Sequence, residues 1–355
     1  SPAIAAEVFP VEKRGLGMGF TAGSQALGML LGTLGAGLLV DALGWQWIFV
    51  ARIPFCVLAL VLGTLFLNKQ SNNTDNTEAF DFKGAVTLIF GLMCLVIGLR
   101  LGRSIGWSSP MVVILISLSP MFLGSLWIIE KRAKAPMLPG ALVKLPAFSI
   151  SITAMFLAHF SVFVIWFVFP FYIADILRQG PLVLGLMLAT MALFNTCLSA
   201  VGGWLCDRFG HLDVGVLGLV TLGTGLFLMG LLEHRDTPVD VVWRIGVVGM
   251  GLGLIQAATY SLMMKGVPND RLGVAGSSLS LAQALGTVMS VALIGTLFAW
   301  RVSVHVAGSE GGITVDDLAF VTAFNEVFLM GCILSVGTAL GFYIVGKIYL
   351  GNKEL

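Results

Sequence analysis

Long apolar stretches, separated by short polar turns, make up most of this chain. Ten of them approach or exceed the roughly 20 residues that a helix needs to cross the hydrocarbon core of a bilayer. They lie at about 16–40, 47–67, 84–101, 111–129, 147–173, 182–206, 214–232, 241–264, 274–300 and 320–346. The pattern therefore predicts an all-α membrane protein with about ten complete transmembrane helices.

Composition supports this prediction. Hydrophobic residues make up 57% of the chain and charged residues 11%, whereas soluble domains usually carry about 25% charged residues. The mean hydropathy is +0.96. A net charge of +1 gives no indication of nucleic-acid binding. The five cysteines lack the spacing of a metal site, so we expect them to pack in apolar segments, and we expect neither a metal nor a cofactor.

One helix and the polar turn before it occur twice, at residues 10–37 and 268–295. The residues that coincide are Pro10, Gly15, Gln25, Ala26, Leu27, Gly28 and Gly37 in the first copy, and Pro268, Gly273, Gln283, Ala284, Leu285, Gly286 and Gly295 in the second. A chance match of two glycine-rich helices is the alternative. Repeats that contain whole membrane helices are typical of secondary transporters built from two similar halves.

The distribution of basic residues predicts which loops face the cytoplasm. Lys and Arg are enriched in cytoplasmic loops. Most of the 20 in this chain fall on one side if the first repeated turn, with Arg14 and Gly15, is placed inside. The second repeated turn, with Arg271 and Gly273, then lies on the same side. We therefore expect a multi-pass membrane protein in which both repeated turns face the cytoplasm.

The spacing of the two copies predicts the domain organisation, because they lie eight helices apart. Two halves of six helices then leave two extra helices between them. We expect 1–67 to end the N-terminal half, 68–130 to hold a cytoplasmic loop and the two extra helices, 131–146 to form a basic cytoplasmic linker, 147–346 to be the complete C-terminal half and 347–355 to be a cytoplasmic tail. Four further helices are expected upstream, so we interpret the chain as a fragment, with a natural truncation as the alternative.

Four sequence segments resemble a known family. They are FPVEKRG at 9–15, the stretch 31–54 ending in LLVDALGWQWIFVARIP, GGWLCDRFGH at 202–211 and VPNDRLG at 267–273. With these segments the chain is similar to the major facilitator superfamily, in its fourteen-helix drug:proton antiporter branch. The resemblance implies a two-half helical bundle that exports small molecules by alternating access. It also implies a multi-pass protein of the plasma membrane, with a bacterial inner membrane as the expected location.

The resemblance also implies two functional motifs. In the antiporter motif helix Gly28, Gly32 and Gly37 fit the glycine pattern, whereas Thr33 replaces a proline and Ala36 a glycine. This departure leaves the proline-dependent kink, and strict antiport, open.

The cytoplasmic gating motif matches at Gly203, Asp207, Arg208 and Gly210, while His211 replaces its final cation. Asp207 and Arg208 form either a salt-bridge latch between the halves or an ordinary charge pair at the membrane interface. We also expect Asp207 to cap the start of the next helix.

Polar residues inside apolar stretches are the candidates for a proton or substrate site, because a charge at a helix centre costs about 2.5–3.5 kcal/mol. Glu326 carries a proton or contacts a cationic substrate, or else it is a hydrated structural residue at the outer mouth. His159 titrates in the range suited to proton exchange, or it packs on a neighbouring helix.

Further candidates lie in other spans. Gln25 and Gln283 occupy equivalent repeat positions and either line a cavity or join helices. The weaker candidates are Asn195, Gln256 and Tyr260, and Trp166 from the aromatic run 160–172, which either lines a cavity for flat lipophilic cations or faces lipid.

No catalytic motif is present: the sequence has no ATP-binding P-loop, no nucleophile elbow and no zinc spacing. We therefore expect no enzyme and predict a secondary active transporter. The prediction is proton-coupled export of drugs or other amphipathic, lipophilic or cationic molecules, with protons and the lipid bilayer as its other partners. A solute importer of the same fold and a non-transporting truncated membrane protein are the alternatives. Nothing in the sequence indicates an oligomeric state.

Overall fold

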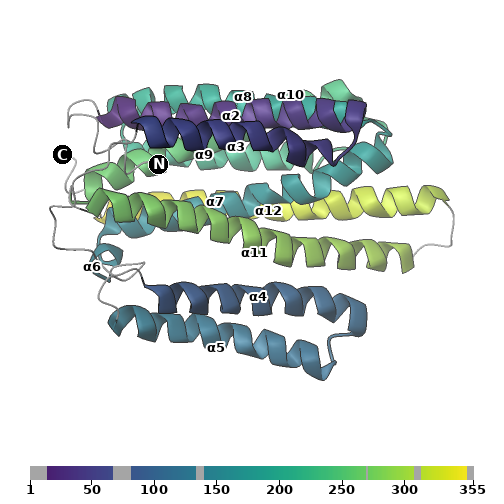
Figure 1. The fold of residues 1–355 in the computed structure, drawn as a ribbon. Coiled ribbons are helices and arrows are strands. Elements are labelled where there is room, and N and C mark those ends of the chain that lie inside the picture. Colours follow the sequence, from purple (N-terminus) through teal and green to yellow (C-terminus); the bar gives the residue numbers. More distant parts are fainter. Residues whose placement is uncertain (1–13, 67–80, 133–139, 269–270, 308–312, 350–355) are drawn as a thin grey trace.

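The computed structural model describes residues 14–66, 81–132, 140–268, 271–307 and 313–349 (Figure 1). These residues form helices and connecting turns, with no strand among them. The long helices are α2 (Arg14–Leu43), α3 (Trp47–Phe66), α4 (Phe82–Ile105), α5 (Pro110–Arg132), α7 (Pro146–Phe171), α8 (Pro181–Phe209), α9 (His211–Met229), α10 (Pro238–Gly266), α11 (Leu272–Ala307) and α12 (Ile313–Tyr349). A short helix, α6 (Gly140–Val143), precedes α7, and a π-helical turn, η2 (Tyr172–Ile176), follows it.

The predicted all-α membrane fold is confirmed. A long helix forms at each of the ten predicted positions, and these helices have from 19 to 37 residues. At 1.5 Å per residue even the shortest is about 28 Å long, close to the hydrocarbon thickness of a bilayer. Eight of the described helices are long and apolar enough to span, and α2 and α5 contribute the shorter apolar stretches Leu27–Leu43 and Pro110–Leu126.

The last two helices are longer than the apolar stretches that predicted them. Helix α11 continues past the predicted end at residue 300 to Ala307, and α12 begins at Ile313 rather than near residue 320. Charged and polar residues mark where an apolar stretch stops, but they do not stop a helix, because water can solvate them on its surface. Both helices therefore extend beyond their apolar cores.

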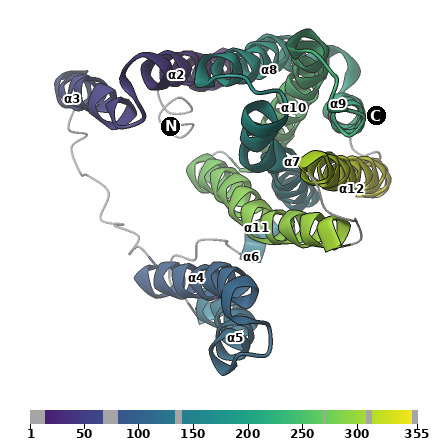
Figure 2. The same ribbon diagram turned by 90° about the vertical axis from the view of Figure 1, so that its right-hand side faces the viewer.

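Helix α7 is the centre of the bundle formed by α7–α12. Seen along the helices, it lies among α10, α11 and α12 (Figure 2), and it packs against all three. Its sequence contains no charged residue, and residues along its whole length, from Ala147 to Phe169, belong to the main cluster of buried side chains. An element that is apolar all round is suited to a position surrounded by other helices.

The remaining helices lie around this bundle (Figure 2). Helix α2 packs along α8. Helix α3 contacts α2, but the apolar segment Trp47–Leu65 of α3 stays exposed. Helices α4 and α5 form an antiparallel pair that meets the bundle mainly at α11. Exposed apolar surface of this extent is expected for helices that face lipid.

Glycines set the distance between several helices. A Cβ atom built on Gly185 of α8 would lie 2.8 Å from the Thr33 carbonyl oxygen of α2 and 3.0 Å from the Gly37 Cα atom. One on Gly253 of α10 would lie 2.5 Å from the Asn195 carbonyl oxygen of α8. Only residues without a side chain allow backbones this close, and close backbone approach gives membrane helices their packing energy.

The end of α7 departs from α-helical geometry. Pro170 lies in its last turn, and the π-helical turn η2 follows, with the Leu177 amide donating to the Tyr172 carbonyl at 3.0 Å. Arg178 then has a φ of 54°, the left-handed region that non-glycine residues seldom adopt. These features turn the chain sharply from α7 into α8.

Replacing Gly253 by Ala tests the role of backbone contact. We expect Gly253→Ala to destabilise the purified protein by about 1–3 kcal/mol, because the new methyl group meets the backbone of α8. Gly337→Ala is the matched control, since a Cβ atom there meets nothing within 4 Å. Helix propensity alone predicts about 0.5–1 kcal/mol of stabilisation at the control site. Thermal unfolding in detergent measures both; equal shifts would contradict this account of the packing.

Candidate functional site

His159 and Gln256 meet inside the bundle. His159 lies near the middle of α7 with 7% of its surface exposed. Its Nδ1 atom lies 3.0 Å from the Met155 carbonyl oxygen one turn earlier, and its Nε2 atom lies 3.4 Å from Nε2 of Gln256 on α10. A carbonyl oxygen only accepts, so Nδ1 carries the hydrogen. Nε2 of the neutral ring then accepts a long hydrogen bond from the Gln256 amide.

A second pair continues the polar contacts toward α11. Tyr260 lies one helical turn beyond Gln256 on α10, and its side chain lies near that of Ser280 on α11, whose hydroxyl group donates to the Gly276 carbonyl oxygen at 3.1 Å. We call the four residues His159, Gln256, Tyr260 and Ser280 the interior polar chain. Three sites proposed separately from the sequence therefore belong to one arrangement across α7, α10 and α11. The contact with Ser280 was not predicted, because no sequence pattern joins residues on different helices.

Other sequence candidates lie apart from this chain. Asn195 on α8 is buried, and its Oδ1 atom has no hydrogen-bond partner in the part of the protein that is described. Gln283 on α11 is half-buried, whereas Gln25 on α2 is exposed. Trp166 on α7 is half-buried and packs against the main apolar cluster. The two glutamines of the repeat thus have different surroundings in the described residues.

Glu326 takes part in an ion-pair cluster. Both of its carboxylate oxygens accept hydrogen bonds from Arg301 of α11, and His305 Nε2 lies 3.2 Å from Oε1. The Arg301 guanidinium also stacks over the Trp300 ring, 5.6 Å from its centroid. About a quarter of each side chain in the Arg301–Glu326 pair is exposed. This two-point contact ties α12 to α11.

The gating-motif residues lie where α8 passes into α9. Asp207 and Arg208 are exposed in the last turn of α8, and the Arg208 guanidinium lies 5.6 Å from the ring centroids of both Trp204 and Phe209. Gly210, with a φ of 91°, makes the turn. It is also the N-cap of α9, without a side-chain hydrogen bond, so the predicted capping role of Asp207 was wrong. Asp207 is not at the N-cap position, because α8 continues for two residues beyond it before α9 can begin.

Of the three glycines Gly28, Gly32 and Gly37 of the motif helix α2, Gly37 is the one with a close neighbour. It packs against Pro181 and Gly185 of α8, whereas Gly28 and Gly32 have nothing within 4 Å of a built Cβ atom. Thr33, which replaces the family's proline, bonds back through its hydroxyl group to the Met29 carbonyl at 3.0 Å. Such back-bonding tends to bend a helix slightly.

The two repeated turns both lead into long helices. Arg14 and Gly15 begin α2. Arg271, whose amide donates to the Pro268 carbonyl at 3.0 Å, directly precedes α11, and Gly273 lies in its first turn. The rest of the first turn lies outside the described residues.

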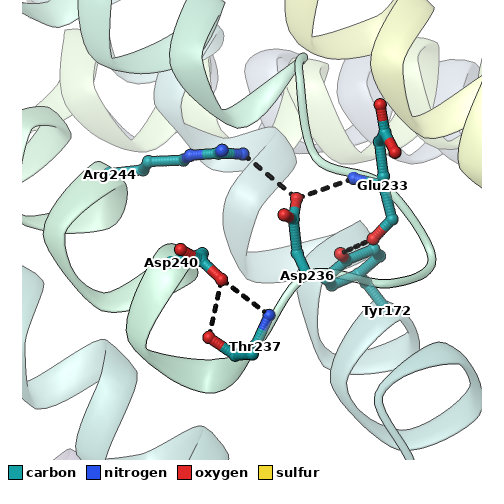
Figure 3. A network of polar contacts seen from close by, with 6 residues as sticks. All are labelled: Tyr172, Glu233, Asp236, Thr237, Asp240 and Arg244. Carbon is teal, nitrogen blue, oxygen red and sulfur yellow. Dashed lines mark hydrogen bonds and ion pairs between the residues drawn. The ribbon is translucent and has the colours of Figure 1, made fainter.

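A polar network at the other end of α9 was missed by sequence reasoning (Figure 3). The Tyr172 hydroxyl donates to the Glu233 carbonyl at 2.7 Å, and the Glu233 amide donates to Asp236 at 2.8 Å. Arg244 of α10 then pairs with Asp236 at 3.3 Å. One part of the network could have been predicted from the sequence: Thr237 and Asp240 have the spacing of a capping box, and the structure contains this capping box. No cluster of three or more metal-ligating side chains occurs among the described residues.

Substituting Glu326 measures what the ion-pair cluster contributes. We expect Glu326→Gln to lower the melting temperature by about 2–4 °C, because Arg301 loses its negatively charged partner and one of the two oxygen acceptors. Arg301→Gln should have a similar effect, and the double variant should lose less than the sum. Asp317→Asn is the control on the same helix, since its pair with Arg178, at 3.7 Å, is far more exposed. Additive losses would show that Glu326 and Arg301 do not stabilise the fold through their contact with each other.

Comparison with known proteins gives one family and several relatives. The Major Facilitator Superfamily model matches residues 1–291. The uncharacterized transporter YebQ of Escherichia coli is 26% identical over 290 residues, which is 81% of this chain and 62% of that protein. The multidrug resistance protein Stp of Mycobacterium tuberculosis is 25% identical over 300 residues, covering 84% and 55%.

A third relative is the tetracenomycin C resistance and export protein of Streptomyces glaucescens, 26% identical over 295 residues, which cover 83% of this chain and 54% of that protein. The chain thus spans between about half and two thirds of the length of these relatives. The family match extends over most of the described helices, including α2, α8, α10 and the gating motif. The chain belongs to the Major Facilitator Superfamily.

Proposed function

We propose that the whole protein exports amphipathic small molecules, above all lipophilic cations, in exchange for protons. The observation that carries this proposal is the similarity over more than four fifths of the chain to proteins named for multidrug resistance and for the export of tetracenomycin C. Relatives at about 25% identity agree in general activity more often than in substrate, so the proposal names a chemical class only. A plasma membrane location goes with it.

The packing supports a two-half organisation. Residues 1–67 belong to one half and 147–346 to the other in this proposal, with 68–130 and 131–146 as the connection. Helix α2 then crosses α8 at the Gly37–Gly185 contact as part of the interface between the halves. Glycine on both sides leaves a smooth surface, on which two helices can rock without displacing side chains.

The gating motif is proposed to act at the cytoplasmic end of this interface. Asp207 and Arg208 are exposed, and among the described contacts Arg208 rests on aromatic rings rather than on a carboxylate. An arginine held in this way keeps all its guanidinium hydrogens for a new acceptor. Such a residue can form the latch in one conformation and release it in the other.

One observation favours a solute importer as the second candidate. Thr33 stands where the antiporter motif has a proline, and its hydroxyl bonds back to its own helix. An importer of the same fold would take up its solute together with protons, and the direction of transport separates the two candidates.

Efflux of a fluorescent lipophilic cation from cells tests the proposal. With the full-length protein present in the membrane, we expect ethidium to be extruded from energised cells, and a protonophore to abolish the extrusion. The physical reason is that uphill export without ATP needs the proton gradient. Cells with the empty vector are the control. Extrusion that survives the protonophore would contradict proton coupling, and uptake in place of extrusion would favour the importer.

Asp207→Asn tests the latch. We expect ethidium efflux to fall about five- to tenfold while the amount of protein in the membrane stays constant, because the variant keeps the shape of the side chain but loses the charge that arginine recognises. Asp213→Asn is the matched control: Asp213 is also exposed, in the first turn of α9, and lies outside the motif. Equal activity of the two variants would reduce Asp207 to an ordinary surface charge.

A further inference from the structure

We propose that Nε2 of His159 carries the coupling proton in the C-terminal helices. We also propose that the side-chain amide of Gln256, on α10, changes its orientation when this nitrogen is protonated. This inference rests on the proposed proton-coupled transport. The observation behind it is the contact between the two side chains in the interior of the bundle, 3.4 Å apart and contributed by different helices.

His159 is isolated from charged groups. Helix α7 has no charged residue. On α10 the charged residues are Asp240 and Arg244 at one end and Lys265 at the other, and on α11 Arg301 and His305 lie in the last two turns. On α12, Asp316, Asp317 and Lys347 lie toward the ends, whereas Glu326 lies further inside the helix and is paired with Arg301. The other titratable side chain of the interior polar chain is Tyr260. A proton held by His159 is therefore not neutralised by a fixed carboxylate among the described residues.

The two nitrogens of His159 have separate tasks. Nδ1 donates its hydrogen to the Met155 carbonyl of the same helix, which fixes the ring orientation and the tautomer. Nε2 is left with its lone pair pointing toward Gln256. A proton can therefore add at Nε2 without disturbing the contact that holds the ring, and this nitrogen faces the neighbouring helix rather than its own.

Protonation reverses the hydrogen bond between the helices. In the neutral state the Gln256 Nε2–H group donates to His159 Nε2. When a proton from water adds to that lone pair, the imidazolium becomes a donor at both nitrogens and repels the amide N–H group. Rotation of the Gln256 amide by half a turn then presents Oε1 as the acceptor. When the proton leaves to water on the other side of the membrane, the ring is again neutral and the original bond can form.

This reversal links proton binding to conformation. An imidazolium that is nine-tenths buried and lacks a counter-ion is costly, so the protonated form favours any conformation in which this region is open to water. The neutral form favours the closed packing seen here. The proton thus has different affinities for the two conformations, which is the requirement for driving one into the other.

The test separates coupling from folding and from transport itself. The full-length protein in proteoliposomes is assayed with ethidium in two ways: accumulation driven by an imposed pH gradient, and exchange of internal for external ethidium without a gradient. We expect His159→Gln to lower gradient-driven accumulation at least about fivefold while exchange stays within about twofold. His234→Gln, a histidine in the exposed turn between α9 and α10, is the matched control and should keep both.

Each outcome decides a different statement. Wild-type protein without gradient-driven accumulation would overturn the proposed function and this inference with it. Wild-type and His159→Gln proteins that accumulate ethidium equally would overturn the inference alone. A folded His159→Gln protein that loses exchange as well would give His159 a role in substrate binding or structure, and this too would overturn the inference.

A second variant decides the matter if His159→Gln does not fold. Gln256→Glu keeps the size of the side chain and places a carboxylate next to His159 Nε2. We expect the pH at which accumulation is half-maximal to shift upward by about one unit, since the carboxylate stabilises the imidazolium. An unchanged pH profile in the folded variant would overturn the inference.

Discussion

The hydrocarbon core of a bilayer offers no water to a peptide group, and the rest of the structure depends on this constraint. Each segment that crosses must satisfy its own backbone, so the described chain is helical throughout. Because lipid is as apolar as leucine, the hydrophobic effect does not press one such helix against another. Contact between backbones does this instead, and Gly185, Gly253 and Gly286 mark where α2 meets α8, α8 meets α10 and α7 meets α11.

The same constraint sorts the polar residues into two groups. Charged side chains that stay partly exposed pair with one another, as Arg244 does with Asp236 and Arg301 with Glu326. The Arg301–Glu326 pair joins α11 to α12, and the Arg244–Asp236 pair joins α10 to the turn that precedes it. In the interior, neutral groups share hydrogen bonds between helices, as His159 does with Gln256. A rigid bundle with one rearrangeable polar contact is well suited to move as a unit.

The sequence predicts the features that depend on neighbouring residues, and it does not predict contacts between distant ones. Helix number and family could be read from apolar length and from local motifs such as GGWLCDRFGH, because both depend on residues close together in the chain. The contacts between side chains on different helices could not be predicted, because the residues lie far apart in the sequence. Gln256 lies 97 residues from His159, and Glu326 lies 25 residues from Arg301. The capping role expected of Asp207 was wrong for a related reason, since it depended on where α8 ends. Helix ends are set by solvation and turn geometry, here by Gly210.

The π-helical turn at the end of α7 also affects how the gene can change. A π-turn contains one residue more than an α-helix needs to cover the same length. Deleting one codon at Ala174, Asp175 or Ile176, beyond the buried Tyr172 and Ile173, would therefore leave an ordinary α-helix in register with the rest of α7. The same deletion near His159 would rotate everything beyond it by about 100° relative to its neighbours. Length variation among descendants of this sequence should accordingly be tolerated at the end of α7 and removed by selection from its middle.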